Sequence, residues 1–201
     1  MAGSASNEAW HPTILTVPGL NGSGPRHWQT LWEQSRPSTI RADLGMWDMP
    51  DRDSWVVKLD QAIRQADGPL VLAAHSLGCI TVAWWAALSP QASDGRVVGA
   101  LLVAPADVDD ADAPAEVKGF AHIPRLRLPF PSIVVASQDD PWLSPERARA
   151  FAADWGSEFV DAGARGHLNG DSGLGAWAAG QELLDKLLLD RSECGGHAPT
   201  V

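Results

Sequence analysis

The sequence predicts an α/β protein in which helices cover both faces of a doubly wound, parallel sheet of about six strands, giving three layers. Several short runs, such as residues 70–74, 97–104 and 132–137, are almost entirely apolar. Strands that are apolar on both faces are typical of a parallel sheet buried between helices. The runs alternate with longer segments whose apolar residues recur at helical spacing, and right-handed crossovers between the strands make such a sheet doubly wound.

Each strand and helix can be placed along the chain in order. The expected strands are residues 13–18, 38–42, 70–74, 97–104, 132–137 and 158–161. The expected helices run from about Pro25 through Trp32, over residues 53–65 and 77–88, from Pro145 to Gly156, and from about Gly175 to Asp190. The segment Ser144-Pro145-Glu146 is a strong helix start, because serine caps free N–H groups, proline fits the first position and the acid favours the positive helix end.

The domain organisation is simple. We expect one domain over residues 12–190, with loose tails at residues 1–11 and 191–201. Residues 105–131 are rich in Asp, Ala and Pro and lack periodicity. That stretch is therefore the candidate for a very small cap over the domain.

Composition excludes several classes of partner. The 201-residue chain carries a net charge of −10, which argues against nucleic acid and anionic membrane as partners. No apolar run approaches the length of about 20 residues that spans a bilayer, and the first residues do not resemble a secretory signal. Cys79 and Cys194 lie in different settings, without zinc-site spacing, so we expect no metal and a cytoplasmic location. Most of the 10 tryptophans are expected in the core, but exposed ones would suit a homodimer surface, so the oligomeric state stays open.

Polar residues that follow the predicted strands are the candidates for chemistry, because ligands of open parallel sheets bind at the carboxyl ends of the strands. Ser76 follows the third strand, Asp139 and Asp140 follow the fifth, and His167 follows the sixth. A serine, an acid and a histidine thus occur in the chain order of a nucleophile, an orienting acid and a base.

The stretch Ala74-His75-Ser76-Leu77-Gly78 is close to the G-x-S-x-G pattern that exposes a serine on a tight strand-to-helix turn, with alanine at the first glycine. His167 would take the proton of Ser76, and Asp140 would orient the imidazole, with Asp139 as the alternative acid. The backbone N–H groups of Leu77 and of Leu20, in the loop Pro18-Gly19-Leu20-Asn21-Gly22, are expected to bind the oxyanion.

Taken together, these motifs resemble a known superfamily. The matching stretches are Val17-Pro18-Gly19 with His27-Trp28, AHSLG, SQDDPWLS and GARGHLNGDSGLG, and they extend over about residues 13–190. They resemble the α/β-hydrolases, and within them the small serine hydrolases typified by retinoblastoma-binding protein nine and its bacterial relatives. The resemblance implies a minimal hydrolase core, a very small cap, cleavage of an ester or amide without a cofactor, and Asp140 as the acid.

The predicted function is a serine hydrolase that cleaves a small ester, thioester or amide of a small-molecule substrate through an acyl-enzyme on Ser76. Candidate pocket residues are Asn21, His27, Trp28 and Trp142. His75 is interpreted as structural and is expected to point away from the serine. The alternative function is a catalytically silent binding module on the same fold, which is disfavoured because no member of the triad is missing.

Overall fold

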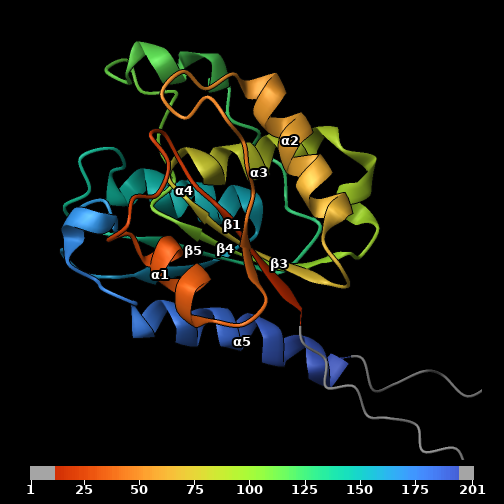
Figure 1. The fold of residues 1–201 in the computed structure, drawn as a ribbon. Helices are drawn as coiled ribbons and strands as arrows, with labels where there is room; N and C mark the ends of the chain where they lie inside the picture. Colours follow the sequence, from red (N-terminus) through yellow and green to blue (C-terminus); the bar gives the residue numbers. More distant parts are fainter. Residues whose placement is uncertain (1–11, 195–201) are drawn as a thin grey trace, which may run out of the picture.

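A parallel sheet of six strands forms the middle layer of the structure (Figure 1). The computed structural model describes residues 12–194. The strands are β1 (Thr13–Val17), β2 (Thr39–Arg41), β3 (Leu70–His75), β4 (Val97–Val103), β5 (Ser132–Ala136) and β6 (Glu158–Asp161). They pair in the order β2-β1-β3-β4-β5-β6, and every pair is parallel. The expected strands are thus all present, and the predicted doubly wound α/β class is confirmed.

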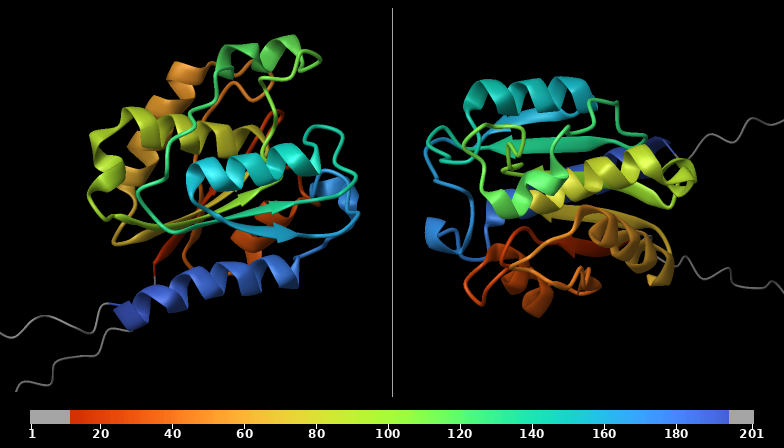
Figure 2. Two further views of the ribbon diagram at one scale, coloured as in Figure 1. Left: turned by 180° about the vertical axis from the view of Figure 1, so that it is seen from behind. Right: turned by 90° about the horizontal axis from the view of Figure 1, so that it is seen from above.

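Helices cover both faces of this sheet (Figure 2). Helices α1 (Trp28–Ser35) and α5 (Ala178–Cys194) lie on one face, and α2 (Arg52–Gln65), α3 (Leu77–Leu88) and α4 (Pro145–Trp155) lie on the other. Three short 3₁₀ helices join them: η1 (Pro90–Ser93), η2 (Ala115–Phe120) and η3 (Gly170–Ser172). The layers explain why β3 is apolar from Leu70 to Ala74, because Leu72 and Ala74 belong to one hydrophobic cluster while Val71 and Ala73 belong to the other.

Two helices begin later than the sequence predicts. Helix α1 starts at Trp28 rather than near Pro25, because His27 is its N-cap and accepts a hydrogen bond on Nδ1 from the backbone N–H of Gln29 at 3.2 Å. Helix α5 starts at Ala178 rather than near Gly175, because Gly175 and Trp177 have φ angles of 57° and 46°. A left-handed residue cannot continue a right-handed helix, so the last helix begins only after Trp177.

The predicted ends of the domain differ slightly from the structure. Helix α5 continues to Cys194, so the backbone of residues 191–194 belongs to the last helix and not to a tail. The rest of the two expected tails, residues 1–11 and 195–201, lies outside the described residues.

The segment expected to form a cap, residues 105–131, contains η2 and is otherwise irregular. Arg147 on α4 ties the start of this segment down, because its guanidinium donates to both carboxylate oxygens of Asp107 at 2.5 and 2.7 Å. The Asp107 side chain is 8% exposed and that of Arg147 is 35% exposed, so the carboxylate is shielded from solvent while the guanidinium is partly open to it.

Candidate active site

The turn between β3 and α3 presents Ser76 at the carboxyl edge of the sheet. Ser76 has a φ of 54°, a strained value for a residue other than glycine. Gly78 is required on the helical side, because a Cβ atom there would lie 2.2 Å from the carbonyl oxygen of Val17. On the strand side, the methyl group of Ala74 is buried in the hydrophobic cluster beneath α2–α4, which explains why alanine is accepted at the first glycine of the motif.

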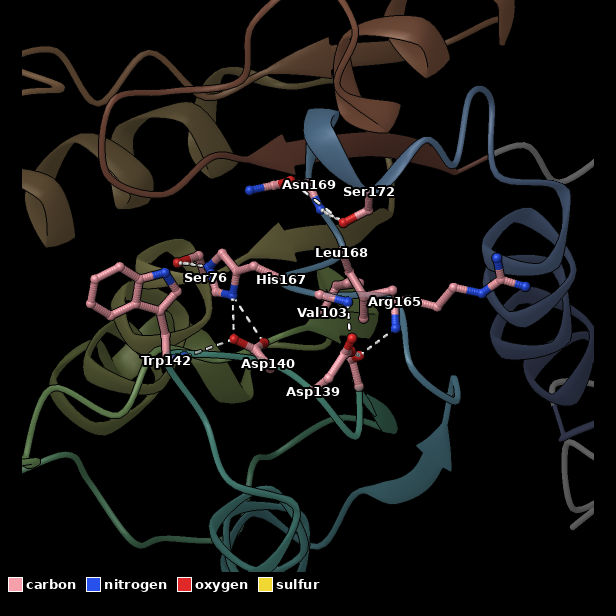
Figure 3. Close-up of polar contacts among 12 residues, drawn as sticks. Ser76, Val103, Asp139, Asp140, Trp142, Arg165, His167, Leu168, Asn169 and Ser172 are labelled. Carbon is pink, nitrogen blue, oxygen red and sulfur yellow. Dashed lines mark hydrogen bonds and ion pairs between the residues drawn. The ribbon is translucent and has the colours of Figure 1, made fainter.

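Ser76, His167 and Asp140 form one continuous chain of hydrogen bonds (Figure 3). His167 Nδ1 lies 2.9 Å from both Oδ1 and Oδ2 of Asp140, and its Nε2 lies 2.8 Å from Ser76 Oγ. Because a carboxylate only accepts, the proton of the neutral imidazole is on Nδ1, and Nε2 is free to accept the proton of the serine hydroxyl. The backbone N–H of Trp142 also donates to Asp140 Oδ1 at 2.9 Å, and the Asp140 side chain is 0% exposed.

The neighbouring carboxylate of Asp139 makes different contacts. Its Oδ1 accepts hydrogen bonds from Ser137 Oγ and from the backbone N–H of Gly166, each at 2.7 Å. These hydrogen bonds lower the pKa of Asp139 below its usual value. Asp139 therefore holds the loop that carries His167, whereas Asp140 contacts the imidazole itself (Figure 3).

The glycine-rich loop after β1 forms a tight turn in which the backbone N–H groups of Asn21 and Gly22 are paired and that of Leu20 is not. The N–H of Gly22 donates to the carbonyl oxygen of Gly19 at 3.0 Å, and the N–H of Asn21 donates to that of Trp47 at 2.7 Å. Within residues 12–194, the N–H of Leu20 has no hydrogen-bond partner.

The same loop packs directly against Ser76. A Cβ atom on Gly19 would lie 2.8 Å from Ser76 Cβ and 3.0 Å from the backbone nitrogen of Leu77. The N–H of Leu77, at the start of α3, also lacks a partner in the described part of the chain. Leu20 and Leu77 both line the cavity that contains Ser76, so two unpaired N–H donors are available beside the serine.

A cavity of about 840 Å³ opens over these groups. Its lining includes Ser76, Asp140 and His167, and three of the four predicted pocket residues: Asn21, His27 and Trp142. The fourth prediction is wrong, because Trp28 is 1% exposed, does not line the cavity, and packs in the core between the sheet and α5.

The sequence does not reveal how much the cap contributes to this cavity. Ala106, Val108 and Val117 of residues 105–131 line it, together with Arg147 and its partner Asp107. Arg147 and Asp107 are forty positions apart, and neither belongs to a recognisable motif. Only the fold brings them together, so no sequence signal identifies them as part of the site.

Two further histidines are buried beside His167 and are neutral. Burial, with a smaller contribution from Arg41, lowers the pKa of His27 to about 4. Burial also lowers the pKa of His75 well below its usual range, helped by the neighbouring His27 and His167. The His75 side chain does not line the cavity, and its Nε2 lies 2.9 Å from the backbone carbonyl oxygen of His167.

Cys79 lies outside the hydrogen-bond chain of Ser76, His167 and Asp140. Burial raises the pKa of the Cys79 thiol well above its usual value, so this residue is a poor nucleophile. In residues 12–194, no group of three or more His, Cys, Asp or Glu side chains is arranged to hold a metal ion. Over the same residues, no helix combines the length and apolar character needed to cross a bilayer.

Several solved structures share this fold. A protein described as a YdeN-like hydrolase from Pectobacterium atrosepticum is 32% identical, with a TM-score of 0.76 and 88% of this chain and 90% of that chain covered. The YdeN gene product of B. subtilis is 16% identical, with a TM-score of 0.67 and coverages of 89% and 99%. Est1E from Butyrivibrio proteoclasticus is also 16% identical, with a TM-score of 0.66 and 90% of each chain covered. The last two show a likeness of fold alone.

A family comparison covers nearly the whole described domain, while no curated protein sequence matches the chain. Residues 14–186 match the serine hydrolase family, a range that includes Ser76, Asp140 and His167. With the match over most of its length and the six-stranded parallel sheet of the α/β-hydrolases, this chain belongs to the serine hydrolase family.

Proposed function

We propose that the protein hydrolyses a small carboxylic ester, thioester or amide, with Ser76 as nucleophile, His167 as general base and Asp140 as the acid that orients the imidazole. The observation that carries this proposal is the unbroken hydrogen-bond chain from Asp140 through His167 to Ser76, which ends in an open cavity. A serine hydroxyl becomes an effective nucleophile only when such a base accepts its proton.

In the proposed reaction, Ser76 Oγ attacks the carbonyl carbon while its proton passes to His167 Nε2. Asp140 stabilises the imidazolium that forms. The N–H groups of Leu20 and Leu77 stabilise the negative charge on the carbonyl oxygen, and His167 returns the proton to the leaving group. Water then attacks the acyl-enzyme by the same route, so the reaction needs no cofactor.

The cavity lining supports an uncharged acyl group. Val108, Val117 and Trp142 offer apolar surface to an acyl chain. The lining also includes the carboxylates of Asp110 and Asp112, which form no salt bridge within the described residues. Their charge opposes binding of an anionic substrate. An ester series from acetyl to octanoyl, together with a succinyl half-ester, tests this preference, and turnover of the succinyl ester should be the slowest.

The decisive experiment for the proposed function is labelling with a fluorophosphonate probe, which reacts with activated serines. Wild type should label strongly, and Ser76→Ala and His167→Ala should not. Folded wild-type protein that neither labels nor hydrolyses any ester of the series would refute the proposal and favour the catalytically silent binding module.

The proposed setting is the cytoplasm, with a small molecule as substrate. The free, buried Cys79 supports a reducing compartment, and the net charge of −10 supports a small molecule rather than a polyanion as the partner. A homodimer is testable by light scattering, and a partner subunit is not needed to complete the proposed set of catalytic groups, which all come from one chain.

A further inference from the structure

The backbone carbonyl groups of His167 and Leu168 are each held by a buried side chain. His75 Nε2 lies 2.9 Å from the carbonyl oxygen of His167, and Trp28 Nε1 donates to the carbonyl oxygen of Leu168 at 2.9 Å. His75 is the last residue of β3 and precedes Ser76, whereas Trp28 opens α1, the first helix after the glycine-rich loop. The backbone that carries the imidazole is thereby tied to the two segments that carry the serine and the free N–H donors.

This backbone needs such restraint, because its local sequence does not favour its conformation. His167 lies outside every helix and strand, between β6 and η3. Leu168 has a φ of 49°, a left-handed conformation that costs a bulky residue on the order of 1–3 kcal/mol. The side chain of Leu168 is 0% exposed and packs in the same cluster as Trp28, so the left-handed turn is held by tertiary contacts.

His75 is suited to act as a permanent donor. Because a carbonyl oxygen only accepts, the proton of the neutral His75 ring must be on Nε2. The ring centroids of His27 and His75 are 4.6 Å apart, and those of His75 and His167 are 4.9 Å apart. Burial lowers the pKa of His75 well below its usual range, so the ring is uncharged at neutral pH, and the carbonyl oxygen of His167 favours the tautomer that donates from Nε2.

We propose that His75 and Trp28 are positioning residues, which hold the backbone of His167 so that its ring meets Ser76 and Asp140 at hydrogen-bonding distance. The proposal rests on the role of His167 as the base. Small displacements of a reacting group carry a large kinetic penalty, about 10²-fold for a shift of 1 Å. The His75 side chain next to the serine therefore contributes to the reaction without touching the substrate.

Two pairs of variants test the proposal. His75→Phe removes the donor but keeps a buried ring, and His75→Gln restores an N–H near the position of Nε2. Trp28→Phe removes the second donor. Its matched control is Trp32→Phe, because Trp32 is equally buried and donates from Nε1 to the carbonyl oxygen of Ala176 at 2.7 Å, away from His167.

The readouts are kcat and KM for a p-nitrophenyl ester, the rate of fluorophosphonate labelling, and Tm. We expect His75→Phe to lower kcat and labelling by roughly 10–100-fold with little change in KM, and His75→Gln to recover most of the loss. Trp28→Phe should lower kcat about tenfold, and Trp32→Phe less than about twofold, even where both lower Tm similarly.

Wild-type kcat in folded His75→Phe, or an equal loss of kcat in Trp32→Phe and Trp28→Phe, would overturn the proposal. The downfield proton resonance of His167 Nδ1–H bonded to Asp140 provides a readout that does not depend on turnover. If wild type shows this resonance and His75→Phe loses it while neither protein labels, positioning stands and the proposed function fails. If wild type labels and His75→Phe keeps both the resonance and the rate, the function stands and positioning fails.

Discussion

Replacing each of the two adjacent carboxylates separately is the sharpest test of how the site works. Both carboxylate oxygens of Asp140 lie 2.9 Å from His167 Nδ1. The substitution Asp140→Asn removes the negative charge and replaces one of these oxygens with an N–H₂ group. The amide can present its N–H₂ to Nδ1 and favour the tautomer with the proton on Nε2, which cannot accept a proton from Ser76. In Asp139→Asn, the Oδ1 atom that binds Ser137 and Gly166 is retained.

The size of the effect follows from the geometry. With nitrogen and oxygen 2.9 Å apart, the centres of the two charged groups are about 4 Å apart, which at an effective dielectric constant of about 20 corresponds to about 4 kcal/mol. Loss of that stabilisation from the imidazolium-containing transition state slows the reaction roughly 10³-fold. The unfavourable tautomer adds to this, so Asp140→Asn should lower kcat/KM by about 10³–10⁴-fold.

The assay is the hydrolysis of p-nitrophenyl acetate, with Ser76→Ala defining the background rate and Tm confirming that each variant is folded. Asp139→Asn is the matched control, and it should keep kcat/KM within about tenfold of wild type, because its hydrogen bonds to the loop persist. If Asp139→Asn proves the more damaging substitution, or if folded Asp140→Asn retains more than about a tenth of wild-type activity, the assigned role of Asp140 is wrong.

Three further predictions address the loop, the buried histidines and the cap. Gly19→Ala should lower kcat about 10²–10³-fold by displacing the free N–H donors, whereas Gly24→Ala, whose Cβ would meet nothing within 4 Å, should leave kcat nearly unchanged. Burial lowers the pKa of His27 from 6.5 to about 4. Between pH 6.5 and pH 4 the His27 imidazole therefore binds a proton only in the unfolded chain, so the free energy of unfolding falls as the pH falls. His27→Asn keeps a helix-capping oxygen but removes the titrating group, so it should reduce that fall between pH 7 and pH 4 by up to about 3 kcal/mol, measured by urea unfolding. An unchanged pH dependence would contradict the neutral state of His27 in the folded protein. Arg147→Gln should raise KM severalfold with kcat nearly unchanged and lower stability by about 1–3 kcal/mol, because Asp107 loses its partner; an unaltered KM would show that the cap does not shape substrate binding.

The sequence predicts much of this architecture because its signals are local. The runs at β3, β4 and β5 are almost entirely apolar, which indicates strands buried on both faces, and the structure has them in the middle of the sheet. Ser76 and His167 could be identified because Ser76 directly follows β3 and His167 lies in the loop after β6, and parallel strands bring their carboxyl ends to one edge. Helix starts were less predictable, because the left-handed backbone at Trp177 depends on its packing and not on its residue type.

By itself, then, the sequence determined the fold class, the family motifs and which polar residues meet at one edge of the sheet, because apolar patterning and chain order are properties of neighbouring residues. Only the tertiary structure decided which of Asp139 and Asp140 contacts His167, since the two are adjacent and chemically identical. It also decided that Trp28 supports the His167 loop from the core and that Arg147 holds the cap through Asp107. The contacts of Trp28 and Arg147 join residues forty or more positions apart, and their geometry exists only once the layers have packed.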